Sequence, residues 1–225
     1  MTGRIPPYYP NPDDTHCSQC CFRMALEYFD PNRPWSFAEL VQLSGKEDGK
    51  PTWPMKMWSG LPALGYDIIV YDDFDYDAFS KDPLNTIALH CNGDENLISY
   101  VKQNDLNKTV AENTVFLDMV GAGNIVLKQE SYTPQTVKSL LDSGCLIISW
   151  VDDGMLMDGF NNGVGHFILL YDYDDSGFWA QNPTTVDQNS GEQQHIPFDH
   201  FMNAVYVNRE AKKTGDMTAI RKKMA

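Results

Sequence analysis

An α+β protein is indicated by three features of this 225-residue chain. Apolar residues at helical spacing are concentrated before Gly144, whereas the short runs after it are rich in β-branched and aromatic residues. Between two of these runs, Asp174 to Gly177 has the composition of a β-hairpin turn. Helices first and antiparallel strands later are typical of an α+β fold.

The first helix is predicted to begin at Cys17, with Asp14 or Thr15 as its cap and an apolar stripe that includes Met24 and Tyr28. Other helices are expected around residues 36–43, 52–65, 95–103, 110–119, 134–141 and 198–204. Strands are expected at residues 67–71, 86–90, 125–128, 146–151, 166–173, 178–181 and 205–207.

The chain is long enough for one domain of two lobes that share a cleft, which we place at residues 1–208. Residues 209–225 hold six Lys or Arg against two acidic residues. Terminal runs of charge usually remain in solvent, so these residues are predicted to form a basic C-terminal tail.

The composition narrows the function classes. The net charge is −14, which disfavours nucleic acid and anionic membranes as partners and favours cationic or neutral substrates. No apolar run reaches the ~18 residues of a membrane span, and the first residues lack a signal-peptide core. Five cysteines make a poor disulfide framework, so a reducing, cytoplasmic location is expected. The sequence implies no cofactor.

Cys17 is the first candidate for chemistry. A thiol in the first turn of a helix lies among unpaired backbone N–H groups at the positive end of the helix dipole. The thiolate is favoured there, and a histidine within reach of a hydrogen bond lowers the thiol pKa further.

A histidine and an asparagine that suit Cys17 occur far downstream. His166 opens a strand-like run after Gly165, and Asn182 is expected at the end of the next strand. A bulge at the hairpin, with Gly177 in the left-handed conformation, shifts the pairing by one residue and brings His166 and Asn182 to the same side. Cys, His and Asn in this order predict a thiol-based catalytic triad.

These residues resemble the papain-like superfamily, and within it the leader-peptidase-like branch, whose cytosolic domains cleave double-glycine leaders of bacteriocin precursors. The residues that carry the resemblance are Cys17, Met24, Tyr28 and Phe29, then Gly165-His166, Asp174 to Gly177, and Asn182-Pro183. The resemblance covers nearly the whole chain up to Asn208. It implies an N-terminal helical lobe with the nucleophile and a C-terminal antiparallel β-sheet lobe with the His and Asn.

The resemblance also implies roles. Cys17 is similar to the nucleophile, His166 to the general base, and Asn182 to the residue that orients the histidine. Relatives have Gln six residues before the cysteine as oxyanion donor, and this chain has Asn11 there, with Gln19 as an alternative donor. The expected activity is hydrolysis of a peptide or small amide through a thioester.

Three alternatives remain open. The same triad can serve an acyltransferase or transpeptidase, in which an amine replaces water. A catalytically silent binding module can keep a papain-like fold. A metal-binding protein is the third, because His16, Cys17, Cys20 and Cys21 offer four ligands, although one helix segment does not easily surround an ion. We expect a cysteine hydrolase without a metal.

Overall fold

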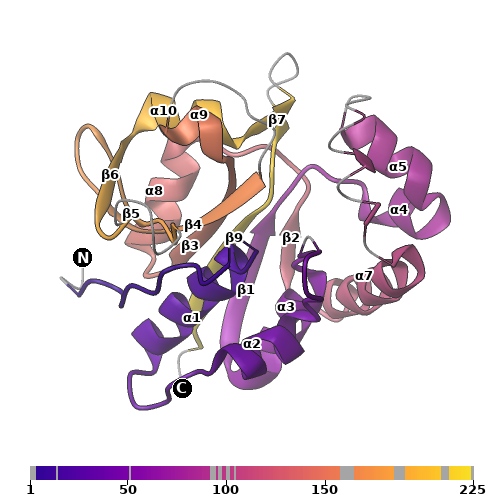
Figure 1. Ribbon diagram of the computed structural model, residues 1–225, viewed down its shortest axis with the longest axis horizontal. Coiled ribbons are helices and arrows are strands. Elements are labelled where there is room, and N and C mark those ends of the chain that lie inside the picture. The colour runs from indigo at the N-terminus through magenta and orange to yellow at the C-terminus, as the bar shows by residue number, and fades with distance from the viewer. Residues whose placement is uncertain are drawn as a thin grey trace.

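A computed structural model describes residues 4–13, 15–50, 52–91, 95, 98–99, 102–103, 105–157, 165–184, 191–208 and 213–223. Within these residues the chain forms a mixed sheet of seven strands with helices on both of its faces (Figure 1). The predicted α+β class is confirmed.

The sheet runs in the order β2-β1-β9-β3-β4-β5-β6, and β2 alone runs parallel to its neighbour. Its strands are β1 (Tyr66–Tyr71), β2 (Val126–Lys128), β3 (Leu146–Asp152), β4 (Gly165–Tyr173), β5 (Gly177–Gln181), β6 (Gln194–Pro197) and β9 (Met217–Lys222). A separate pair joins β7 (Tyr206–Asn208) to β8 (Lys213–Thr214). Strands from both halves of the chain therefore build one sheet, which is not the purely antiparallel C-terminal lobe that was expected.

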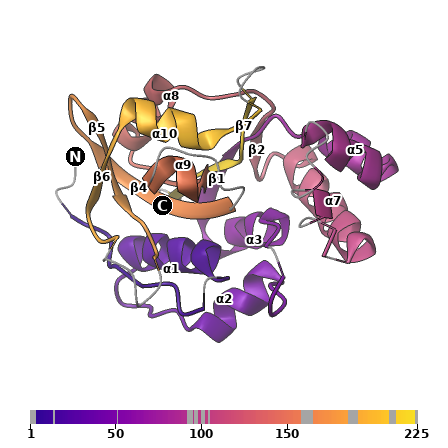
Figure 2. The ribbon, with the colours of Figure 1, turned by 45° about the horizontal axis from the view of Figure 1, so that its top comes forward.

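The helices divide between the two faces of the sheet (Figure 2). One core lies under α1 (Cys17–Phe29), α2 (Phe37–Ser44), α3 (Met55–Gly60) and the 3₁₀ turn Leu61–Leu64, and it continues under α4 (Tyr76–Lys81), α5 (Pro83–His90) and α7 (Leu106–Gly121). The other core lies under α8 (Pro134–Asp142), α9 (Asp153–Met157) and α10 (Phe198–Val205).

Local sequence signals account for several helix ends. Ser36 forms a capping box with Glu39 at the start of α2, and Thr133 caps α8, whose first residue is Pro134. Gly65 ends the 3₁₀ turn at φ +85°, a left-handed conformation that other residues adopt at a cost. Helices α2 and α8 therefore begin within one residue of the predicted starts at residues 36 and 134.

One predicted strand is wrong. Residues 86–90 belong to α5, which begins after the cap Asp82 with Pro83 in its first turn. The cap and the proline outweigh the β-branched Thr86 and Ile87, because helix propensity differs among such residues by only a few tenths of a kcal/mol. The helix predicted at 95–103 lies mostly outside the described residues.

The predicted basic tail is also wrong for residues 217–222. They form β9, which lies between β1 and β3 in the middle of the sheet. Met217 and Ala219 face the α8–α10 core, and Ile220 faces the α1–α3 core. The many charges in this segment favoured a tail, but its apolar residues form a strand that is buried on both faces. A domain boundary at residue 208 would therefore divide a single sheet.

The hairpin bulge exists, but at another place. The register between β4 and β5 shifts between Leu170 and Asp172, and Gly177 pairs with Pro197 as an ordinary strand residue. Gly177 is not one of the described glycines with positive φ, so it does not adopt the predicted left-handed conformation. The extra residue is Tyr171, and its side chain packs on the same face as α1.

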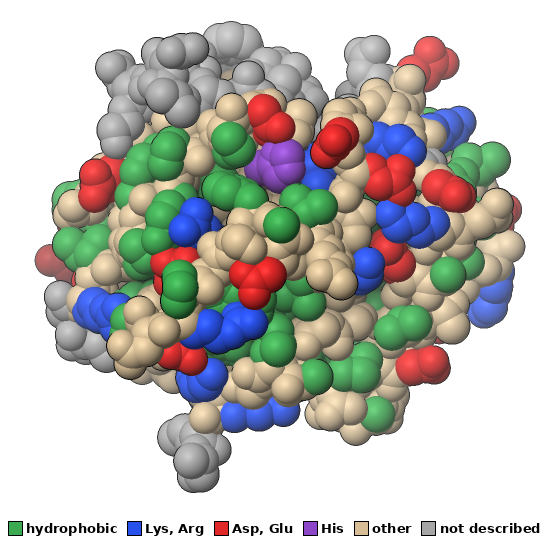
Figure 3. Space-filling view, turned by 60° about the horizontal axis from the view of Figure 1, so that its bottom comes forward, with side chains coloured by type: hydrophobic (Ala, Val, Ile, Leu, Met, Phe, Trp, Pro, Cys, Tyr) green, Lys and Arg blue, Asp and Glu red, His purple; other side chains and the backbone are tan. Residues whose placement is uncertain are grey.

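The surface carries mixed charge. Figure 3 shows acidic and basic side chains interspersed on one face, without a field of one sign. In the part of the chain that the structure describes, none of the helices combines the length and apolar character needed to cross a membrane.

Candidate active site

Cys17 is the first residue of α1, and the helix packs along β4 and β3. Thr15 does not cap the helix as predicted, because it donates to Asp13, and His16 occupies the N-cap position without a side-chain bond. The other predicted cap, Asp14, lies outside the described residues. The side chain that meets the helix start is Asn11, whose Oδ1 accepts from the backbone N–H of His16 at 3.1 Å. The thiol keeps its predicted position at the head of the helix.

The side chain of His166, near the start of β4, lies close enough to the Cys17 thiol to act on its charge. Burial raises the pKa of the Cys17 thiol, but the interaction with His166, the charge of the imidazolium and the backbone N–H groups of Phe167 and Ser18 outweigh burial and lower that pKa. Burial lowers the pKa of His166, and its contacts with Cys17, Asn182 and Asp153 reverse this and raise it. Both shifts favour a thiolate–imidazolium pair.

The imidazole of His166 is held by Asn182, the residue that follows β5. His166 Nε2 and Asn182 Oδ1 are 2.7 Å apart, which leaves Nδ1 of the ring for the thiol. Asn182 is fully buried, and its Nδ2 donates to Gln194 Oε1 at 2.9 Å. Gln194 therefore fixes which end of the Asn182 amide faces the histidine. The sequence analysis missed Gln194, because nothing in the sequence pairs β6 with the end of β5.

The bulge in β4 makes this contact possible. On the side of the bulge away from the hairpin turn, Leu169 pairs with Gln181, so Asn182 falls opposite Ile168. His166 lies two residues before Ile168, and its side chain therefore points to the same face of the sheet as that of Asn182. Without the extra residue, Asn182 would fall opposite Leu169 and point to the other face. A bulge therefore brings His166 and Asn182 to the same face, as the sequence predicted, although it lies at Tyr171 and not at Gly177.

The backbone around Asn182 is closely packed. Its N–H donates to Gly191 O at 2.9 Å, and a Cβ on Gly191 would lie 2.0 Å from Asn182 O. Tyr8 donates its hydroxyl to the same carbonyl at 3.3 Å, and the N–H of Asn11 donates to Thr184 O at 3.0 Å. The N-terminal segment thus joins the helix start to the Asn182 segment.

The two candidate oxyanion donors differ in their partners. Asn11 is 3% exposed, and because its Oδ1 accepts from His16, its Nδ2 is the end of the amide left for a ligand. Gln19 is fully buried and donates its Nε2 to Ser44 at 2.9 Å and to Thr52 at 3.3 Å. The N–H groups of Gln19 are therefore directed to α2 and the following loop.

Gly165 and Trp150 form one side of the histidine's surroundings. A Cβ on Gly165 would lie 2.4 Å from Trp150 Nε1, so only glycine lets the indole lie against the start of β4. Gly165 pairs with Asp152, and His166 with Val151. The glycine of the Gly-His pair thus has a packing role beside the histidine.

Three charged groups lie near the thiol and imidazole. The negative charge of Asp153 raises the pKa of His166, and Asp13 Oδ1 lies 2.6 Å from His16 Nδ1. Lys46, to which the sequence analysis gave no role, is 6% exposed and donates to the carbonyls of Glu47 and Lys50. Burial lowers the pKa of Lys46, and the charges of Asp13 and Cys17 oppose this.

The four side chains of the proposed Cys-rich metal site do not converge. Cys20 Sγ is directed to Pro10 O at 3.5 Å and Cys21 Sγ to Phe167 O at 3.3 Å, while His16 pairs with Asp13. Among the described residues, the group whose ligand atoms come within 4.8 Å of one another is elsewhere: Asp72, Asp73 and His90.

That acidic group is held mainly by protein partners. Asp72 Oδ1 accepts from Phe74 N at 3.1 Å and Oδ2 from the Tyr76 hydroxyl at 2.6 Å. Lys213 Nζ lies 3.9 Å from Asp73 Oδ2. Burial raises the pKa of Asp72 to about 6.

No protein-family model matches the chain, and a search of curated proteins finds no significant match. The geometry around Cys17 is therefore the basis for the function proposed below.

Proposed function

We propose that this protein is a papain-like cysteine hydrolase that breaks a peptide or small amide bond through a thioester on Cys17. The observation that carries the proposal is the meeting of three side chains: the Cys17 thiol interacts with His166, and His166 Nε2 lies 2.7 Å from Asn182 Oδ1. A nucleophile, a base and a residue that orients the base are the parts that thiol acyl transfer requires.

In the proposed reaction, Nδ1 of His166 takes the thiol proton and Cys17 Sγ attacks the substrate carbonyl carbon. The C–N bond breaks as His166 returns the proton to the leaving amine, and the thioester remains on Cys17. Water, deprotonated by His166, attacks the thioester, which releases the carboxylic acid and restores the thiol. Asn182 keeps the imidazole in the tautomer and orientation for both transfers.

The oxyanion is proposed to bind Asn11 Nδ2 together with a backbone N–H at the start of α1. Asn11 suits this role because its Oδ1 already accepts the His16 N–H at the start of α1, so its Nδ2 is the end of the amide that remains for the oxyanion. We assign the role to Asn11 in preference to Gln19, whose Nε2 donates to Ser44 and Thr52. Loss of one oxyanion donor costs about 10²–10³-fold in kcat.

The substrate is proposed to be cationic or neutral, because the net charge of −14 repels anions. All five cysteines are free, which suits the reducing environment of a cytoplasm. Water as the acceptor gives a hydrolase, and an amine as the acceptor gives a transpeptidase with the same residues.

The test is a covalent one. The protein would be treated with a peptidyl electrophile, digested and analysed by mass spectrometry, and then assayed on an amide library with and without an added amine. Cys17→Ala and His166→Ala should abolish adduct and turnover, Asn182→Ala should leave a measurable remnant, and Asn11→Ala should lower kcat alone.

Reactivity of Cys17 that is unchanged in His166→Ala would refute the proposed pair. If the electrophile labels Cys17 while no library member is cleaved or transferred, a silent module is favoured. An effect of Gln19→Ala on kcat without any effect of Asn11→Ala would move the oxyanion donor to Gln19. Cys20→Ser serves as the matched control, because Cys20 lies in the same helix turn but is buried away from His166.

A further inference from the structure

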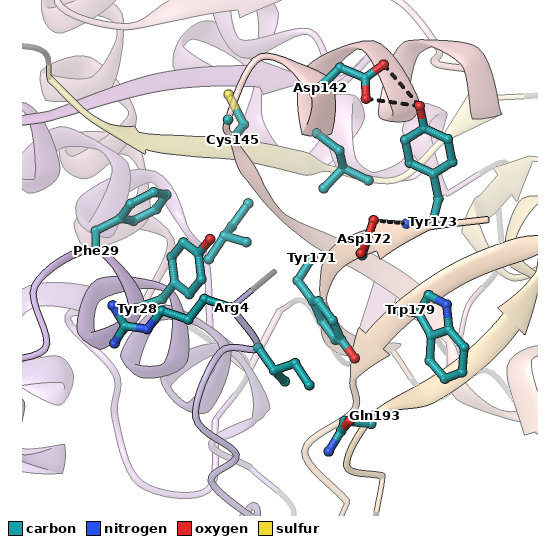
Figure 4. A pocket seen from close by; sticks show the side chains of 14 residues that line it. Arg4, Tyr28, Phe29, Asp142, Cys145, Tyr171, Asp172, Tyr173, Trp179 and Gln193 are labelled. Atoms are coloured by element: carbon teal, nitrogen blue, oxygen red, sulfur yellow. Dashed lines mark hydrogen bonds between the residues drawn. The ribbon is translucent and has the colours of Figure 1, made fainter. Parts of the chain in front are cut away.

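A cavity lies at the end of α1 and β4 that is far from Cys17 (Figure 4). Its volume is about 590 Å³, within the range of sites for small molecules. The last turn of α1, the N-terminal segment, the start of β3 and the β4–β5 hairpin contribute to its walls. Five aromatic residues line it: Tyr28, Phe29, Tyr171, Tyr173 and Trp179.

The cavity is separate from the candidate active site. Cys17 begins α1 and Tyr28 lies eleven residues later, roughly 16 Å along a helix. His166 lies near the start of β4 and Tyr171 five residues later, roughly 17 Å along a strand. The candidate active site and the cavity therefore lie at opposite ends of α1 and β4.

The β4 bulge builds the wall of this cavity. Leu169 and Tyr171 pack on the α1 side of the sheet, and Leu170 packs on the other side. Asp172 pairs directly with Trp179 after the shift, and Trp179 has the same parity as Gln181, the partner of Leu169. The side chains of the consecutive residues Tyr171 and Asp172 therefore both point to the α1 face of the sheet, and the indole of Trp179 lies beside the carboxylate of Asp172.

The cavity also carries acidic groups that lack a basic partner. Asp172 Oδ1 accepts from the N–H of Tyr173 at 2.8 Å, and its second oxygen accepts no hydrogen bond from the described residues. Asp142 accepts the Tyr173 hydroxyl at 2.9 and 3.0 Å. Neither carboxylate belongs to an ion pair within the described part of the chain.

Among the described residues that line this cavity one is basic, and it indicates what the site attracts. The guanidinium of Arg4 is 5.3 Å from the centre of the Tyr28 ring, a cation–π distance. Arg4 itself is exposed and lines the cavity together with Tyr28 (Figure 4). A guanidinium thus already contacts an aromatic ring of the cavity.

We propose that this cavity is a binding site for a ligand with a guanidinium group on an aliphatic stem, such as an arginine residue. Asp172 binds the guanidinium, and the rings of Tyr171 and Trp179 contact its faces and stem. A guanidinium suits this set because it is planar, donates hydrogen bonds in its plane and stacks on aromatic rings. The net charge of −14 adds a long-range attraction for such a cation. Arg4 lines the same cavity, and its positive charge opposes the binding of such a cation.

The test uses L-argininamide as the probe and its neutral near-isostere L-citrullinamide as the control ligand, titrated by calorimetry at low salt. The Cys17→Ala protein is used throughout, so the result is independent of the proposed hydrolase activity. Saturable binding of one L-argininamide is expected, with at least roughly tenfold weaker binding of L-citrullinamide, because a charged hydrogen bond is lost.

Variants locate the site. Asp172→Asn should weaken L-argininamide binding by roughly tenfold or more, whereas Asp175→Asn should not, because Asp175 is an exposed acid of the same hairpin outside the cavity. Arg4→Ala should strengthen binding severalfold by removing a like charge from the cavity. Circular dichroism would verify that each variant is folded.

Three results of the titrations would overturn the proposal, and a fourth would come from Arg4→Ala. They are no saturation at about 10 mM L-argininamide, equal affinity for L-citrullinamide, and equal losses in Asp172→Asn and Asp175→Asn, which would mean unspecific attraction to the acidic surface. Weaker binding in Arg4→Ala would contradict the role of Arg4 as an opposing charge, and with it the choice of a guanidinium.

Discussion

Cys17 differs from the other four cysteines in exposure and in the charge state that its surroundings favour. It is half-buried beside His166, whereas the others are buried. Burial raises the pKa of Cys20 to about 12, and it raises the pKa of Cys21 well above its usual range. The nearby thiols of the same helix are therefore held as thiols.

Iodoacetamide at low dose and neutral pH should label Cys17 before any other cysteine, because the thiolate is the nucleophile. Peptide mass mapping over time would measure the order of labelling. His166→Ala should slow labelling of Cys17 by removing the partner that lowers its pKa. Earlier labelling of Cys91 or Cys145 would contradict the assignment.

Gln194 is a positioning residue in this site, because it contacts Asn182 and not the thiol. Gln194→Ala should lower kcat by roughly tenfold, the value of one lost hydrogen bond, with KM little changed. The loss should be smaller than in Asn182→Ala. Gln194→Glu keeps an oxygen for Asn182 Nδ2 and should recover most of the rate. A Gln194→Ala enzyme with normal kcat would show that Asn182 is held without it.

At the level of elements, the ends of β1 and β9 place acidic groups together. Asp72 follows β1, Asp216 precedes β9, and their pairing brings both ends to the same edge of the sheet. Burial is the main cause that raises the pKa values of Asp72, Asp73 and Asp216. The folded protein therefore binds protons here that the unfolded chain releases.

The free energy of unfolding should rise as the pH is lowered from about 7.5 to 5.5. The pKa of Asp72 is about 6 in the folded state against 3.8 as a free group, so its charged form opposes folding by up to roughly 3 kcal/mol above pH 6, and this cost disappears as the pH approaches 4. Urea unfolding at both pH values would measure it.

Asp72→Asn should raise the free energy of unfolding at pH 7.5 and reduce its change with pH, because the amide keeps the acceptor for Phe74 and can donate to the Tyr76 hydroxyl. Asp118→Asn, an exposed acid on α7, is the matched control and should leave the difference unchanged. A wild-type protein that is less stable at pH 5.5 than at 7.5, with Asp72→Asn showing the same change, would disprove this account.

For the molecule as a whole, the last strand is central to the sheet. β9 pairs with β1 on one side and β3 on the other, and Thr218 accepts from Trp58 of α3 at 2.6 Å. Without β9, the backbone N–H and C=O groups of β1 and β3 that face it lose their hydrogen-bond partners, and both cores lose the side chains that β9 contributes.

Deletion of residues 213–225 should therefore prevent cooperative folding, which thermal unfolding followed by circular dichroism would detect. Deletion of residues 224–225 alone is the control and should leave the melting temperature within a few degrees, since it leaves β9 intact. A shortened chain that still unfolds cooperatively would mean that the remaining strands form a sheet without β9.

The sequence by itself determined the local features: the helix headed by Cys17, the caps Ser36 and Thr133, and the strands that carry His166 and Asn182. These follow from neighbouring residues, because capping, turn chemistry and apolar spacing act over a few positions. The meeting of Cys17 and His166 was a prediction from residue types, and in the structure each of the two side chains shifts the pKa of the other.

Only the tertiary structure decided the pairings. The bulge at Tyr171, the support of Asn182 by Gln194 and the central place of β9 depend on residues far apart in the chain. No local pattern specifies which strand pairs with which, or in which register, because each backbone offers the same hydrogen bonds to every neighbour. The packing of the two cores selects the one register in which His166 and Asn182 meet.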